Sequence, residues 1–192
     1  MAGERAEAIL TGPQAERRRR VVAAAMELGD EGGYEAVQMR DVASRANVAM
    51  GTVYRYFSSK DHLLAVALAD WAEDLEAQLA ADPPVGRSPA DRVAQLFRRA
   101  TRVVAEHMQL IAAMVYAISS ADPGVVECQS RVSATVERMI RRAIGSPAPA
   151  EVDGICRILS HVWYATLLGS VNGWSNVGEM GEELALAARL LL

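Results

Sequence analysis

The sequence predicts an all-α protein of about nine helices. Apolar residues recur at helical spacing in one segment after another, as Val21, Ala25 and Leu28 do near the N-terminus. Glycine, proline or a capping side chain marks the ends of these segments. No stretch of convincing length alternates apolar and polar residues as a half-buried strand does. Because 51% of its 192 residues are hydrophobic, the chain can also bury a sizeable core.

The N-terminal boundaries follow from turn residues. Residues 1–13 are expected to be disordered, and the first helix spans residues 14–31, ending where two glycines at 32–33 free the backbone. Two short helices fall within residues 38–57. The turn between them contains Asn47, a residue that tolerates left-handed backbone. Three helices are therefore expected ahead of residue 60.

The later helices follow from caps, prolines and apolar faces. The serine pair 58–59 can cap a long helix that begins at Lys60. Asp122 followed by Pro123 is a helix start, with a capping residue and a proline at the first helical position. Segment 108–118 is apolar almost all round, as in a helix that is buried or lines a cavity. These helices are expected over residues 60–81, 88–106, 108–118, 122–145, 151–171 and 179–192.

Charge divides the chain into a small basic part and a larger acidic one. Residues 38–60 contain four basic side chains and one acidic, although the whole chain has a formal net charge of −4. Residues 64–192 contain 11 basic and 15 acidic side chains. We therefore expect a DNA-binding domain over residues 14–60 and a separate helical domain over residues 61–192.

Residues 38–64 have the pattern of a helix-turn-helix. Val42, Val53 and Phe57 fall on inner faces, whereas the polar and aromatic residues between them cannot all be buried. An inner face that packs and an outer face of hydrogen-bonding side chains are what this motif needs to enter a DNA groove. The candidate DNA-contacting residues are Gln38, Arg40, Arg45, Met50, Gly51, Thr52, Tyr54, Arg55, Tyr56 and Lys60.

Each role has a physical reason. Gly51 lets the second short helix approach the DNA backbone closely. Thr52 offers a hydroxyl and a methyl group to base edges. Tyr54 and Tyr56 suit phosphate oxygens, although plain packing is the alternative for both. Lys60 adds positive charge at a helix N-terminus, which already favours phosphate.

The pattern V-x-x-G-T-x-Y-x-Y-F-x-x-K-x-x-L runs from Val48 to Leu63, with Gly33, Tyr34, Asp41, Val42 and Ala43 upstream. This segment resembles the TetR family of one-component repressors. Asn47 stands where the family usually has glycine, and Ala49 where it often has a capping serine. The resemblance implies a homodimer that binds a palindromic double-stranded DNA operator and carries a variable helical ligand-binding and dimerisation domain. The low cysteine content separately indicates a reduced, cytoplasmic compartment.

A narrower resemblance lies in the runs GGYEAVQMR and VAMGTVYRYFSSKDHLL, which are similar to KstR-type repressors of steroid catabolism in actinobacteria. It implies control of steroid-degradation genes and release by a hydrophobic effector, a steroid or its coenzyme A thioester. Regulation of efflux or fatty-acid metabolism by a different hydrophobic inducer is the alternative.

The apolar helices of residues 61–192 can supply a chamber for such a ligand. Methionine adapts to irregular ligands, although apolar side chains at helical spacing more often form core. A ligand pressing on Trp71 would tilt the helix that begins at Lys60, next to the DNA-binding domain. The candidate ligand-lining residues are Trp71, Phe97, Met108, Ile111, Met114, Val115, Ile118, Met139, Trp163 and Leu167.

The last two helices carry a second apolar stripe with small residues that allow close approach. The family resemblance implies that they form an antiparallel four-helix bundle with a second copy, whose two-fold symmetry matches a palindromic operator. The candidate interface residues are Ile158, Val162, Ala165, Leu184, Ala187 and Leu191.

Other classes of function have little support. His62, His107 and His161 are far apart in the sequence and have no metal-ligand spacing, and we expect His161 in the core or in an interface. No Ser-His-Asp, GxSxG or P-loop pattern occurs. Cys128 and Cys156 need no disulfide framework, and no apolar run reaches the roughly 18 residues of a membrane span. We expect no enzyme, metal, cofactor or membrane partner. A helical enzyme or carrier, and an architectural DNA-binding protein without an inducer, remain as alternatives.

Overall fold

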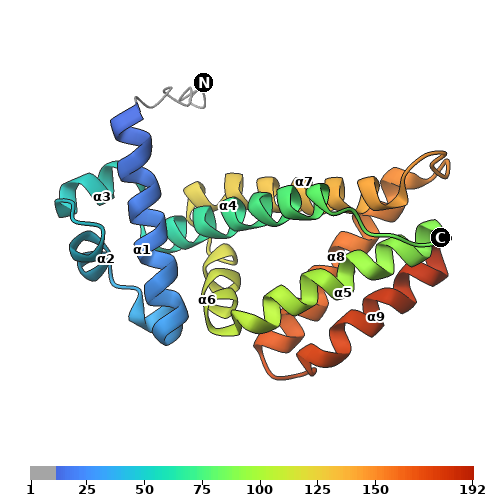
Figure 1. Cartoon of the computed structure of the whole chain (residues 1–192). Helices are drawn as coiled ribbons and strands as arrows, with labels where there is room; N and C mark the ends of the chain where they lie inside the picture. Colours follow the sequence, from blue (N-terminus) through green and yellow to red (C-terminus); the bar gives the residue numbers. More distant parts are fainter. Residues whose placement is uncertain (1–11) are drawn as a thin grey trace.

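The computed structural model describes residues 12–192, and in this part of the chain it contains nine helices and no strand. The all-α prediction is confirmed. Figure 1 shows the helices in chain order. They are α1 (Gly12–Ala36), α2 (Met39–Arg45), α3 (Met50–Tyr56), α4 (Lys60–Ala81), α5 (Pro89–Glu106), α6 (Met108–Ile118), α7 (Pro123–Ile144), α8 (Val152–Val171) and α9 (Val177–Leu191).

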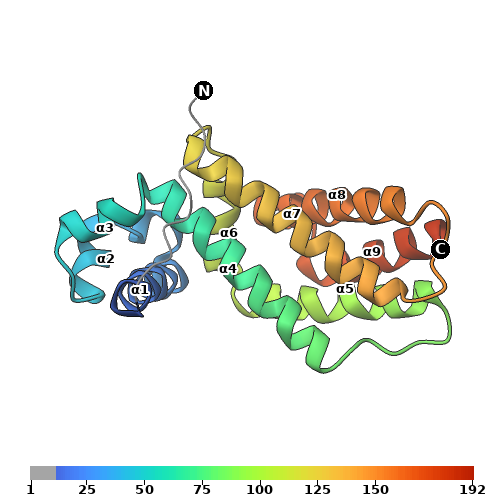
Figure 2. The same cartoon turned by 90° about the horizontal axis from the view of Figure 1, so that it is seen from above.

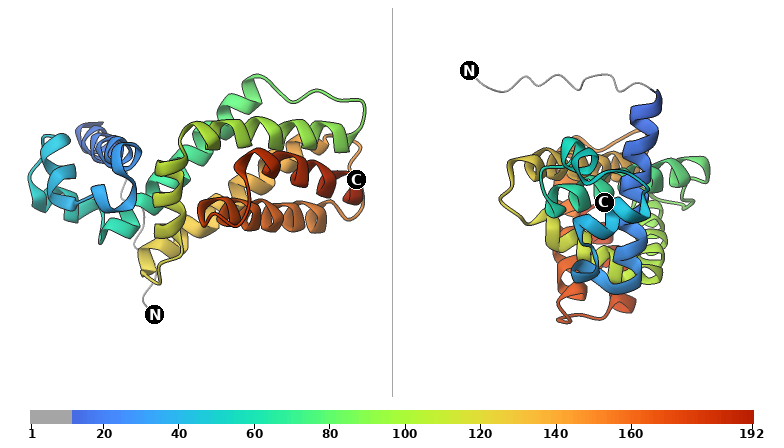
Figure 3. Two further views of the ribbon diagram at one scale, coloured as in Figure 1. Left: turned by 90° about the horizontal axis from the view of Figure 1, so that it is seen from below. Right: turned by 90° about the vertical axis from the view of Figure 1, so that its left-hand side faces the viewer.

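The molecule has a small head and a longer helical body. Helices α1, α2 and α3 form the head, and α4 leaves it to run beside α7 (Figures 1 and 2). Helix α6 packs against both α1 and α4, so it lies between the head and the body. Helices α5, α8 and α9 complete the body, and the right-hand view of Figure 3 looks at the molecule from the head end. Helix α4 is therefore shared by both parts.

The first helix differs from the prediction at both ends. Gly12 and Pro13, expected to be disordered, lie in its first turn, where a proline loses no intrahelical hydrogen bond. The rest of the segment expected to be disordered lies outside the described residues. Helix α1 continues to Ala36, but Gly32 and Gly33 have non-helical backbone angles, with φ of 67° at Gly33. The chain thus kinks where the two glycines were expected to end the helix.

Several predicted boundaries are confirmed in detail. Asn47 has a φ of 51° in the turn between α2 and α3. Ser59 caps α4 and Asp122 caps α7 with their side chains, whereas Ala49 at the start of α3 makes no side-chain cap. Gly145 ends α7 with a φ of 73°, in the left-handed region that favours glycine.

The core is continuous from the head into the body. Val42, Val53 and Phe57 are buried in the head, as their spacing predicted. Leu63 and Leu64 are fully buried at the start of α4 and belong to the same cluster. None of the described helices combines the length and the hydropathy that a membrane-spanning segment needs. The head is therefore fixed to the body by packing as well as by the chain.

Thr101 on α5 carries a buried hydroxyl without a hydrogen-bond partner in residues 12–192, and the residue is only 7% exposed. We expect Thr101→Val to raise the free energy of unfolding by about 1 kcal/mol, because valine keeps the shape and removes the unpaired polar atom. Urea denaturation followed by circular dichroism measures the change.

Thr135 supplies a matched control. It is also buried, but its Oγ1 donates to the carbonyl oxygen of Arg131 at 2.9 Å and accepts from Arg138 at 2.9 Å. Thr135→Val should therefore lower stability. A higher free energy of unfolding in both variants, or in neither, would contradict the explanation by the unpaired hydroxyl.

Candidate functional site

The outer face of α3 holds most of the residues expected to contact DNA. Val53 points into the head core, whereas Met50, Gly51 and Arg55 are exposed and Tyr54 is 53% exposed. The remaining two candidates on this helix, Thr52 and Tyr56, are partly buried. Helix α3 thus presents the mixed polar and aromatic surface that a recognition helix needs.

Arg55 is held at the C-terminal end of α3 by its neighbour. Its guanidinium carbon lies 5.1 Å from the centre of the Tyr56 ring, and its Nη2 donates to the Tyr56 hydroxyl at 3.4 Å. Gln38, just before α2, donates from its side chain to the carbonyl oxygen of Glu35 at 2.9 Å. Arg40 on α2 is exposed and 3.6 Å from Asp41, so its charge can reach solvent or a phosphate.

Arg45 and Lys60 make contacts within the protein, and the contacts with DNA expected of them stay predictions. Arg45 donates to the Glu31 carboxylate at 2.6 and 3.1 Å, and this hydrogen bond lowers the pKa of Glu31. The Lys60 ammonium lies 3.6 Å from the centre of the Tyr34 ring and donates to the Tyr34 carbonyl oxygen at 3.2 Å. Both contacts join segments distant in sequence, which local patterns do not reveal. Both residues therefore also hold elements of the head together.

Tyr34 links the head to α4 and α6. Its hydroxyl donates to Asp61 at 2.5 Å, and its ring centre lies 4.5 Å from that of Tyr116 on α6. Burial, followed by the hydrogen bond to Asp61, raises the pKa of Tyr34 well above its ordinary value. The phenol therefore stays protonated and keeps donating at physiological pH.

Asp122 makes a second link, at the other side of α4. Its carboxylate accepts hydrogen bonds from Ser59 Oγ at 2.6 Å, from Ser58 Oγ at 3.3 Å and from the backbone N–H of Gly124 at 2.8 Å. The hydrogen bond from Ser59 is the main reason that the pKa of Asp122 is lowered. One ionised side chain thus joins the first turns of α4 and α7.

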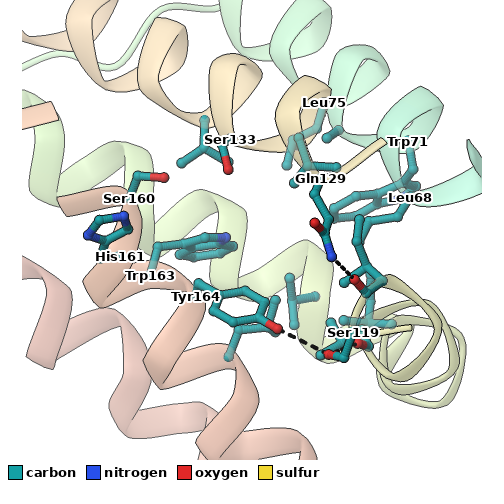
Figure 4. A pocket seen from close by; sticks show the side chains of 18 residues that line it. Leu68, Trp71, Leu75, Ser119, Gln129, Ser133, Ser160, His161, Trp163 and Tyr164 are labelled. Atoms are coloured by element: carbon teal, nitrogen blue, oxygen red, sulfur yellow. Dashed lines mark hydrogen bonds between the residues drawn. The ribbon is translucent and has the colours of Figure 1, made fainter. Parts of the chain in front are cut away.

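A cavity of about 380 Å³ lies between α4, α6, α7 and α8, in the size range of small-molecule sites. Its lining contains no Asp, Glu, Lys or Arg side chain. Figure 4 shows its side chains around a common space. The lining residues are Leu68, Trp71, Ala72, Leu75, Val104, Ile111, Val115, Ile118, Ser119, Gln129, Val132, Ser133, Val136, Ser160, His161, Trp163, Tyr164 and Leu167.

Six of the ten residues predicted to line a ligand site line this cavity. They are Trp71, Ile111, Val115, Ile118, Trp163 and Leu167. Phe97, Met108, Met114 and Met139 do not line the cavity. Phe97 stacks behind Trp163 with ring centres 5.8 Å apart, and Met114 is fully buried in the core. A helix that is apolar all round offers only one of its sides to a cavity, and the sequence does not say which.

The prediction from sequence also omitted much of the cavity lining. On α7 the missed residues Gln129, Val132, Ser133 and Val136 recur every three or four positions, so helical spacing could have identified them as one face. His161, expected in the core or in an interface, is exposed at the rim of the cavity. Polar lining residues were missed because the prediction rested on apolar side chains alone.

Helices α8 and α9 leave a partly apolar face exposed. Ile158 and Ala165 on α8 are exposed, while Val162 on α8 and Ala187 and Leu191 on α9 are partly buried. Leu184, expected in the interface, is instead fully buried within the protomer. It lies on the core side of α9, whereas Leu190, one turn and a half further on, is 76% exposed. We call the surface formed by Ile158, Val162, Ala165, Ala187, Leu190 and Leu191 the α8–α9 face.

Two family models match the chain. One, described as bacterial regulatory proteins of the tetR family, covers residues 21–67, which include α2 and α3. The other, described as the tetracyclin repressor-like C-terminal domain, covers residues 86–191, more than half of the chain. The chain belongs to the TetR family. The predicted family is thereby confirmed, and the TetR family is regulatory and DNA-binding, not catalytic.

Individual TetR-type relatives agree. The HTH-type transcriptional repressor KstR of Rhodococcus jostii (strain RHA1) is 38% identical over 180 residues, which are 93% of this chain and 84% of that protein. KstR of Mycobacterium tuberculosis (strain ATCC 25618 / H37Rv) is 36% identical over 93% of this chain and 82% of its own. A solved TetR transcriptional regulator from Rhodococcus sp. RHA1 superposes with a TM-score of 0.83 at 31% identity, covering 94% of this chain and 97% of its own. The narrower similarity to KstR is also confirmed.

Proposed function

We propose that this TetR-family protein is a cytoplasmic, ligand-responsive repressor that binds a palindromic operator as a homodimer and is released by an apolar effector. The observation that carries the proposal is the position of α4. This helix begins at the head with Lys60 and contributes Leu68, Trp71 and Leu75 to the cavity wall. A change in the cavity can therefore move the element that carries the DNA-reading surface.

The DNA-binding half of the proposal places α3 in the major groove. Tyr54 and Arg55 on its exposed face would contact phosphates or base edges, with Thr52 at the base edges. Two copies related by two-fold symmetry would place two such helices about 34 Å apart, one helical turn of DNA. The α8–α9 face supplies the apolar surface for pairing.

The cavity supports an effector with an uncharged, apolar body. Among residues 12–192, its lining contains no Asp, Glu, Lys or Arg side chain, so an ionised group deep inside it would have no fixed charge as a partner. The similarity to KstR supports a steroid, and the phosphates of any coenzyme A thioester would remain outside the lining. Arg98 and Arg99 on α5 are paired with Glu182 and Asp82, so they are not free cations awaiting those phosphates.

The cavity also favours a regulated protein over an architectural one, since an architectural protein needs no such space. A ligand that binds better when α4 and α7 are further apart would shift the population toward that arrangement. The differential affinity needed is modest, because a coupling of about 1–3 kcal/mol changes operator affinity about 5- to 150-fold.

Operator release tests this function. The operator is selected from random duplex DNA with the full-length protein, and binding is followed by fluorescence anisotropy. We expect the coenzyme A thioester of a steroid carboxylic acid to raise the operator Kd at least about fivefold, and free coenzyme A to leave it unchanged. Release by a long-chain acyl coenzyme A but not by the steroid compound would support the alternative, a fatty-acid regulator. An unchanged Kd with bound steroid thioester, shown by calorimetry, would refute steroid control.

A further inference from the structure

The cavity differs in polarity between its two ends. At the end nearer the head, Gln129 donates to the carbonyl oxygen of Ile118 at 2.6 Å, and Ser119 Oγ donates to the carbonyl oxygen of Val115 at 3.2 Å. Ser119 Oγ also lies 3.3 Å from the Tyr164 hydroxyl, and the Gln129 and Ser119–Tyr164 bonds are drawn in Figure 4. The polar groups at this end are therefore satisfied by the protein itself.

The end away from the head has polar groups of another kind. Ser133 on α7 and Ser160 and His161 on α8 lie together there, on the opposite side of the cavity from Ser119 (Figure 4). Within residues 12–192, these three side chains have no hydrogen-bond partner in the protein. Ser133 and His161 are exposed and can bond to solvent at the rim.

Ser160 is the informative residue of the three. It is 93% buried, and Figure 4 shows its hydroxyl directed into the cavity. The hydroxyl oxygen is not itself fully buried, so it faces the cavity space. An apolar ligand that covered it without a hydrogen bond would leave it buried and unpaired, which costs free energy. The hydroxyl of Ser160 thus forms no hydrogen bond that stabilises the fold of residues 12–192.

We propose that Ser160, assisted by Ser133 and His161, binds a hydroxyl or keto oxygen at one end of an otherwise apolar effector. The serine hydroxyl can donate to a ketone or accept from an alcohol, and neutral imidazole can do either. No fixed charge lies in the lining, so the bound oxygen belongs to a neutral group. The oxygen end of the effector would then point away from the head, with the apolar remainder against Trp71. This inference deepens the proposed function and depends on the same cavity.

A matched pair of rigid compounds tests the subsite. The neutral dye Nile red is bound to the full-length protein and displaced by 5α-androstan-3-one or by 5α-androstane, which has the same rings without the oxygen. We expect the ketone to bind about fivefold more tightly, the contribution typical of one hydrogen bond. Ser160→Ala should bring the two compounds within about twofold of each other without weakening the hydrocarbon.

Ser130→Ala on α7 is the control, because it removes a hydroxyl outside the cavity lining that already donates to the carbonyl oxygen of Val126 at 3.3 Å. It should leave the preference for the ketone intact, and circular dichroism should show that both variants keep the wild-type helix content. Equal binding of the two compounds to wild type, a preference that survives in Ser160→Ala, or no displacement by either compound would overturn the subsite. Operator anisotropy in parallel separates the two proposals: a Ser160-dependent preference without operator release leaves the subsite standing and refutes steroid control.

Discussion

Replacing Tyr54 by alanine is expected to lower operator affinity by at least about 100-fold. Tyr54 projects from α3 and is half exposed, so its side chain contributes little to the head core. A hydrogen bond to a charged group contributes about 1.5–3 kcal/mol, and a two-fold dimer would lose it twice. The combined loss of about 3 kcal/mol or more corresponds to at least 100-fold in Kd.

Anisotropy of labelled operator measures this effect, with thermal unfolding as a check on the fold. Tyr54→Phe keeps the ring and removes the hydroxyl, so it should show most of the loss if the phenol contacts a phosphate. Val85→Ala, at an exposed site in the loop between α4 and α5, should bind like wild type. If Tyr54→Ala binds as tightly as Val85→Ala, Tyr54 takes no part in reading DNA.

Leu190→Glu is expected to convert the protein into a monomer. Leu190 is mostly exposed in the protomer, so the substitution should leave the fold intact. In a two-fold interface each copy would bury one unpaired carboxylate, at a cost of about 2 kcal/mol or more at a partly solvated position. The total of about 4 kcal/mol would raise the dimer dissociation constant on the order of 1,000-fold, and operator affinity should fall with it.

Val85→Glu places the same charge on the α4–α5 loop, at a side chain that is also well exposed. It should leave the dimer unchanged in sedimentation equilibrium, while Leu190→Glu shifts the mass to that of one chain. A dimeric Leu190→Glu variant would exclude the α8–α9 face around Leu190 as the interface. Thermal unfolding of both variants distinguishes a loss of dimerisation from a loss of the folded structure.

Local chemistry explains which features could be predicted from sequence. Asn47 adopts the positive φ that its short amide side chain tolerates, and Ser59 and Asp122 cap the helices that follow them. Each of these signals depends on neighbours within three residues. The buried faces marked by Val53 and Phe57 follow from helical periodicity, which is equally local. The head and the order of helices were therefore predictable.

Features that depend on distant partners were not predictable. The ion pair of Arg45 with Glu31 depends on how α2 packs against α1, which local sequence patterns do not reveal. Leu184 belongs to the same apolar helix as Leu190, and only the position of α5 decides which of the two is buried. Ser160 stands among apolar residues of a predicted helix, where a single serine gives no sign that it borders a cavity. The interior of the candidate site was therefore only partly predictable.

The fastening of the head has a consequence for the entropy of DNA binding. Besides the covalent connection through α4, the head is attached to α6 by Tyr34 and Tyr116, and the start of α4 is held to α7 by Ser59 and Asp122. A head that is attached at separate points has little rotational freedom. The two heads of an effector-free dimer would therefore already be restricted to a narrow range of orientations. Binding DNA then costs little additional conformational entropy, which favours high operator affinity. An effector that loosened either attachment would weaken operator binding by restoring that disorder, even if the average spacing of the heads stayed the same.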